Sequence, residues 1–176
     1  MESGGRERRP IEARGMKRVL HLLTAAVVFF AADNLLAMDG FQKEAKGDTT
    51  TKVNVDSKGI ILKGYDAVAY FKEGKPVKGN PAIESAYQGS IYLFASAANK
   101  ADFDKDPAKY APRYGGFCAN GVAHGVLSDP EDPSAFTVYK GKLYVCANQG
   151  GLKSFKNDIN GSIDKADENW RRLTGP

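Results

Sequence analysis

The chain is poor in the side chains that bind soft metal ions. Its 176 residues contain two cysteines, two histidines, three methionines and one tryptophan. So few cysteines exclude a disulfide-dense scaffold, and so few soft ligands restrict any metal site to a small number of them. Only Met38 follows the apolar N-terminal segment, so a methionine-rich copper site is also excluded.

Motifs of common enzyme classes are absent as well. The chain has no G-x-S-x-G nucleophile elbow and no G-x-x-x-x-G-K-[ST] phosphate loop. The segment 102–106 begins like a calcium-binding loop, but Pro107 replaces the required glycine and Arg113 the bidentate glutamate. These absences disfavour a conventional hydrolase or dehydrogenase, and the sequence favours a protein that is not an enzyme.

No block of basic residues interrupts the body of the chain, and the net charge is only +4. Residues 1–37 carry six basic and four acidic side chains, which leaves 19 basic and 17 acidic ones in the remainder. Nucleic-acid binding normally requires a clustered basic surface. We therefore expect no nucleic-acid partner, and no protein partner is indicated.

No apolar run is long enough to span a bilayer. A basic pair precedes the apolar stretch 19–32, which at about 14 residues is shorter than the roughly 20 that a membrane-spanning helix needs. A charged start, a short apolar segment and a small residue at Ala37 are typical of a secretory signal peptide. We predict a signal peptide over residues 1–37, with an N-terminal extension at 1–15. The protein would be exported, periplasmic or secreted, without a membrane span after cleavage; a retained anchor is the alternative.

The remaining chain divides into a polar segment and one folded domain. Residues 38–52 have few apolar side chains, which predicts a flexible linker. Residues 53–173, about 120 in all, are enough to bury one hydrophobic core. Strand-like and helix-like segments occur together in this part. The sequence therefore predicts a single small α+β domain with short antiparallel hairpins and several short helices.

Hydrophobic spacing and turn residues locate these elements. We predict one hairpin with strands 83–87 and 91–94 around Gln88-Gly89, and a second with strands 136–139 and 143–145. A further strand is predicted at 65–71, followed by a turn at 72–76 and a helix at 97–103. Apolar residues from Leu152 to Trp170 recur at helical spacing, which predicts two core-packing helices separated at Asn160-Gly161.

The most unusual segment is 110–125, which combines Cys118 and His124 with four glycines. Glycine allows close backbone approach or a positive φ, so the run Tyr114-Gly115-Gly116-Phe117 before the cysteine indicates a functional patch. We expect Cys118 in or beside a pocket lined by aromatic side chains. Six residues of continuous helix would place Cys118 and His124 about 120° apart. Their pairing therefore requires a turn, which Gly121 can supply.

The second cysteine, Cys146, lies 28 residues after Cys118. In an exported protein such a pair is typically a disulfide. The two cysteines and His124 would instead supply three ligands to copper, zinc or iron, with a carboxylate or water as the fourth. A reactive Cys118 thiol resolved by Cys146 is a third interpretation. The residues alone do not choose among these three.

Six motifs, in order along the chain, resemble those of the YHS-domain family in its exported bacterial branch. They are GYDAVAYF at 64–71, KPVKG at 75–79, YQGSIYLFAS at 87–96, DPAKYAPRYGGFCA at 106–119, GKLYV at 141–145 and IDKADENW at 163–170. The resemblance implies a small α+β domain in which metal binding is suspected. This chain departs from the family's F-C-S-x-x-C segment, because Ala95 and Asn99 replace the two cysteines. Neither residue is a soft-metal ligand.

Three functions stay open at this point. The favoured one is an exported domain that binds a soft metal ion or a metal cofactor, centred on Cys118. The second is a thiol-redox protein that uses Cys118 together with Cys146. The third is a structural or partner-binding domain in which the two cysteines form a disulfide. The sequence specifies neither the metal nor a substrate.

Overall fold

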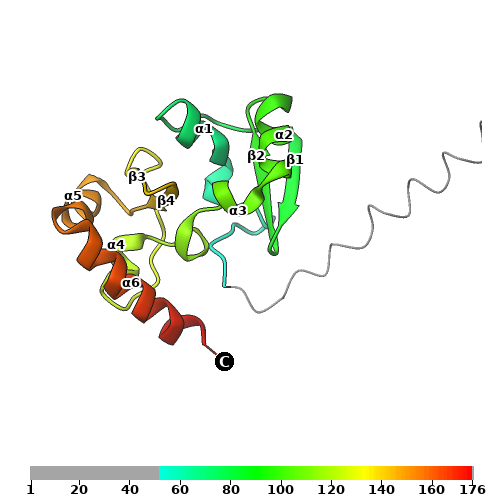
Figure 1. Cartoon of the computed structure of the whole chain (residues 1–176). Helices are drawn as coiled ribbons and strands as arrows, with labels where there is room; N and C mark the ends of the chain where they lie inside the picture. Colours follow the sequence, from blue (N-terminus) through cyan, green and yellow to red (C-terminus); the bar gives the residue numbers. More distant parts are fainter. Residues whose placement is uncertain (1–51, 176) are drawn as a thin grey trace, which may run out of the picture. The chain divides into compact units, whose positions relative to one another are not determined.

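The computed structural model describes residues 52–175, which fold into helices and two small antiparallel hairpins (Figure 1). The elements, in chain order, are η1 (Leu62–Gly64), α1 (Ala67–Lys72), β1 (Asn80–Tyr87), β2 (Ser90–Phe94), α2 (Ala97–Lys105), α3 (Pro107–Tyr110), η2 (Arg113–Gly116), α4 (Ala119–Ala123), β3 (Phe136–Tyr139), β4 (Lys142–Val145), α5 (Gln149–Asn157) and α6 (Ile159–Thr174). The predicted α+β class is confirmed. The predicted signal peptide at 1–37 lies outside the described residues, as does nearly all of the predicted linker at 38–52.

Both predicted hairpins are present, and both use the same kind of turn. Gln88 and Gly89 have φ values of 45° and 73°, and Lys140 and Gly141 have φ values of 48° and 71°. Two successive residues with positive φ match the twist of antiparallel strands. β1 pairs with β2, and β3 pairs with β4. The first hairpin is longer than predicted, because β1 begins at Asn80 with an irregular register near its start.

The strand predicted at 65–71 is wrong: after one isolated bridge at Tyr65, the chain forms helix α1. The cause is Asp66, whose carboxylate caps the helix by accepting hydrogen bonds from the backbone N–H groups of Val68 (2.8 Å) and Ala69 (3.2 Å). An aspartate at this position stabilises a helix start. The aromatic and β-branched residues that suggested a strand are instead buried on a short helix.

Two C-terminal helices are present as predicted, but they separate at Asp158 rather than at Asn160-Gly161. The Asp158 carboxylate accepts a hydrogen bond from the Gly161 backbone N–H at 3.0 Å and so caps α6. Gly161 therefore lies in the first turn of the helix. The apolar stripe from Leu152 to Trp170 packs into the core, as predicted.

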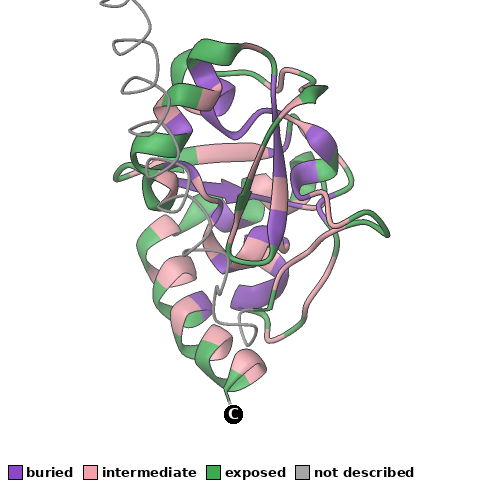
Figure 2. Cartoon of the chain, turned by 90° about the vertical axis from the view of Figure 1, so that its right-hand side faces the viewer, coloured by how far each residue is buried: buried purple, intermediate pink, exposed green. Residues whose placement is uncertain are grey.

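The hydrophobic core consists of two clusters that meet at β4. Figure 2 shows the buried residues of the chain in purple. Leu143 and Val145 pack into the first cluster, with α1, α2 and the β1–β2 hairpin. Tyr144 and Cys146 pack into the second, with α4, α5 and α6. Successive strand residues point to opposite faces, so this segment is buried on both sides. Among residues 52–175, no helix combines the length and apolarity needed to cross a membrane.

Candidate functional site

The fold brings Cys118 and Cys146 together in the second core cluster. Cys118 is the N-cap residue of α4, and Cys146 directly follows β4. Both are free thiols, with exposed fractions of 3% and 0%. A site this deeply buried is closed to macromolecules and suited to an ion or a very small molecule.

Hydrogen-bond donors surround the sulfur of Cys118. The backbone N–H of Ala147 donates to it at 3.1 Å, and that of Gly121 at 3.4 Å. Hydrogen bonds from the Cys146 thiol, the largest cause, and from these N–H groups and the Ser128 hydroxyl lower the pKa of Cys118 to about 5, although burial opposes the shift. Hydrogen bonding to the charged form of a group favours that form. These hydrogen bonds therefore favour the thiolate form of Cys118.

Cys146 has the opposite protonation state. Its hydrogen bond to Cys118 raises the pKa of the Cys146 thiol far above its ordinary value, and burial and the charge of the Cys118 thiolate act in the same direction. The two shifts describe one arrangement, in which a thiol donates its hydrogen to a neighbouring thiolate. This arrangement favours a state in which the two sulfurs share one proton and carry one negative charge.

Gly121 has a specific role beside this pair. A Cβ atom at this position would lie 2.4 Å from the hydroxyl oxygen of Ser128, which is one of the donors to Cys118. The backbone N–H of Cys118 also donates to the Ser128 carbonyl at 2.9 Å. The absence of a side chain at Gly121 thus gives the hydroxyl room to reach the sulfur. Sequence reasoning missed Ser128, because nothing local marks a serine ten residues from the cysteine.

His124 does not join the cysteines, contrary to the predicted three-ligand set. Gly121 lies inside α4 and supplies no turn between Cys118 at the N-cap and His124 at the C-cap. The His124 side chain is exposed, and its Nδ1 is 2.7 Å from the carbonyl oxygen of Asn120. Within residues 52–175, no group of three or more His, Cys, Asp and Glu side chains is placed to hold a metal ion.

The predicted patch from Tyr114 to Phe117 supports the site from one side. Tyr114, Gly115 and Gly116 all have positive φ, between 56° and 81°. A Cβ at Gly115 would lie 2.1 Å from the carbonyl oxygen of Lys52, so this glycine permits a close backbone approach. The approaching backbone is the chain's own segment rather than a ligand. Tyr114 and Gly115 line a cleft, and Cys118 is not among its lining residues.

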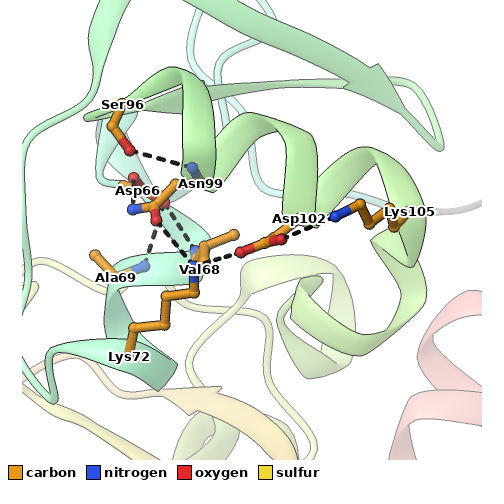
Figure 3. Close-up of polar contacts among 8 residues, drawn as sticks. All are labelled: Asp66, Val68, Ala69, Lys72, Ser96, Asn99, Asp102 and Lys105. Carbon is orange, nitrogen blue, oxygen red and sulfur yellow. Dashed lines mark hydrogen bonds and ion pairs between the residues drawn. The ribbon is translucent and has the colours of Figure 1, made fainter.

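The positions of the family's missing cysteines are occupied by a hydrogen-bond network centred on Asp66 (Figure 3). One carboxylate oxygen accepts from the Val68 and Ala69 N–H groups. The other accepts from the Ala95 N–H at 2.8 Å and from the Asn99 amide at 2.7 Å. Four donors saturate this fully buried carboxylate. The donor set contains no sulfur and leaves no acidic oxygen free, so it does not fit a soft metal ion.

One family model matches a segment of the folded part. No curated protein and no solved structure matches the chain. The model of the YHS domain family matches residues 68–114, from α1 to η2, and does not distinguish an exported branch. Cys118 and Cys146 lie beyond the matched segment. The match of the YHS domain model to residues 68–114 agrees with the resemblance of the sequence motifs to that family.

Proposed function

We propose that Cys118 and Cys146 form a buried two-sulfur site that binds one soft monovalent metal ion such as Cu(I). The observation that carries this proposal is the pairing of the two sulfurs, one a thiolate and one a thiol donating to it. Thiolates select soft ions, and both ligands here are sulfur. Suspected metal binding in the YHS family supports a metal role, although its usual cysteines are absent from this chain.

The chemistry follows from the single shared proton. A monovalent ion that binds both sulfurs takes the place of this proton, which leaves for solvent. The net charge of the buried site stays at minus one, so the exchange adds no charge to the core. The N–H groups of Ala147 and Gly121 continue to stabilise the Cys118 sulfur. A zinc ion would require four ligands, and two sulfurs supply only half of them.

The direct test is an anaerobic titration of the reduced protein with Cu(I) against a competing chromophoric chelator. We expect one ion per chain, and loss of this binding in Cys118→Ser and in Cys146→Ser. His124→Ala is the matched control and should bind as the parent does, because its side chain is exposed and stands apart from the sulfurs. Equal binding by the parent and both serine variants would contradict the proposal.

A second candidate function is reversible thiol oxidation, which the contact between a thiolate and a thiol favours. The Cys118 thiolate would attack one oxygen of a hydroperoxide, giving a sulfenic acid and releasing the other oxygen as an alcohol or water after protonation. The Cys146 sulfur would then attack the sulfenic sulfur, forming the disulfide and releasing water. The burial of both sulfurs restricts the oxidant to a small molecule of this class.

Mass spectrometry after peroxide treatment tests this second function. The parent protein should lose two hydrogens, and Cys146→Ser should stop at a sulfenic acid that dimedone traps. Survival of both thiols under peroxide would exclude the redox function and leave the metal site unaffected.

A further inference from the structure

A cleft of about 290 Å³ lies apart from the cysteine pair, where the two core clusters adjoin. Tyr92 comes from the first cluster, and Tyr114 and Trp170 are associated with the second. Tyr87 completes the aromatic lining. The volume is at the lower limit of ordinary ligand pockets, so the cleft suits a molecule with one ring.

The aromatic rings form two pairs within this lining. The ring centroids of Tyr114 and Trp170 are 5.8 Å apart, and those of Tyr87 and Tyr92 are 6.4 Å apart. The rings of each pair pack against one another at these distances, and aromatic side chains favour another flat ring as a neighbour. The shape and lining therefore suit an aromatic body rather than a flexible aliphatic chain.

The charged residues of the lining are Arg113 and Lys142, and no acidic residue lines this cleft. Arg113 is fixed in place, because its guanidinium lies over the Tyr114 ring at 5.3 Å and pairs with Asp167 at 2.7 Å. Asp167 also accepts from the Tyr114 hydroxyl at 2.9 Å. The Asp167 carboxylate offsets the charge of Arg113. Asp167 lines a neighbouring surface hollow and not this cleft.

Lys142 leaves the cleft with a net positive charge. It lies at the start of β4, and none of the ion pairs among residues 52–175 includes it. A cation that forms no ion pair attracts an anion. The N–H groups of Arg113 that Asp167 does not engage add further donors. We propose that this cleft binds a small aromatic carboxylate, with the ring among Tyr87, Tyr92, Tyr114 and Trp170 and the carboxylate near Lys142 and Arg113.

Trp170 makes the proposal directly measurable, because it is the chain's only tryptophan and it lines the cleft. The full chain is titrated with benzoate and, separately, with uncharged benzyl alcohol, while the emission of Trp170 is recorded. We expect a saturable change with benzoate and weaker binding of benzyl alcohol. Lys142→Glu should weaken benzoate binding by about fivefold or more, the effect of reversing one exposed charge.

The matched control is Lys153→Glu, on the exposed face of α5 and outside the lining. It makes the same charge change and should leave benzoate binding as in the parent. Far-UV circular dichroism verifies that both variants are folded. Three results would overturn the proposal: no saturable change with benzoate, equal binding of benzyl alcohol, or equal weakening by the two lysine variants.

Discussion

Hydrogen bonding between Cys118 and Cys146 lowers the pKa of Cys118 and raises that of Cys146, inside a core that buries both side chains. The two residues come from different parts of the fold, one from the start of α4 and one from the end of β4. Their contact therefore depends on how the β3–β4 hairpin packs against α4. Neither cysteine lies in the segment that matches the YHS family, so this pair is a feature that the match does not account for.

Stability should rise with pH between about 5 and about 9. The pKa of Cys118 falls from its usual value near 9 to about 5 on folding, so between these values the unfolded chain binds one more proton at this residue. Folding then becomes more favourable with rising pH, by up to roughly 1 kcal/mol per pH unit. Above the usual pKa the gain ends, and the raised pKa of Cys146 makes stability fall again. Urea unfolding of the reduced protein over this range measures how the free energy of unfolding depends on pH. Cys118→Ser should lose this dependence. The same pH dependence in the parent and in Cys118→Ser would contradict the assigned protonation.

Gly121→Ala and Ser128→Ala should both raise the pKa of Cys118. The first displaces the Ser128 hydroxyl, which would lie 2.4 Å from the new Cβ, and the second removes it. Either change takes away one donor to the sulfur, so the pKa of Cys118 should rise while the protein still folds. Ultraviolet absorbance of the thiolate as a function of pH measures this. If the pKa of Cys118 is unchanged in both variants, the Ser128 hydroxyl does not stabilise the Cys118 thiolate.

Asp66→Ala should destabilise the protein by roughly 3 kcal/mol or more, since it removes a helix cap and leaves four N–H donors, three of them buried, without their acceptor. The matched control is Asp102→Ala on α2, whose exposed pair with Lys72 is shown in Figure 3 and should matter little. Thermal or urea unfolding compares the two. Similar small losses in both would contradict the central role of Asp66.

We propose that the protein is exported and that its N-terminal segment is removed near Ala37. The support is the short apolar stretch 19–32 after a basic pair. Mass spectrometry of the protein from its native cells should give an N-terminus near Met38. An intact N-terminus on protein recovered from the cytoplasm would contradict export.

Local signals in the sequence were sufficient to predict the two hairpins, and insufficient where distant residues decide the structure. The two-residue turn Gln88-Gly89 favours positive φ at both positions, so this hairpin could be predicted from the local sequence. The helix at 67–72 was missed because a single capping aspartate and burial overrode strand propensity. The Ser128 hydroxyl and the Ala147 N–H reach Cys118 only through folding, so no sequence spacing indicated them.

The number of protons released when Cu(I) binds tests the central claim most directly. A lightly buffered, anaerobic sample near neutral pH is titrated while the pH change is followed, with Cys146→Ser as the comparison. Because the two sulfurs share one proton, we predict release of about one proton per bound ion in the parent protein and no such release in the variant. Release of two protons per ion, or the same release from Cys146→Ser, would contradict a thiolate at Cys118 paired with a thiol at Cys146.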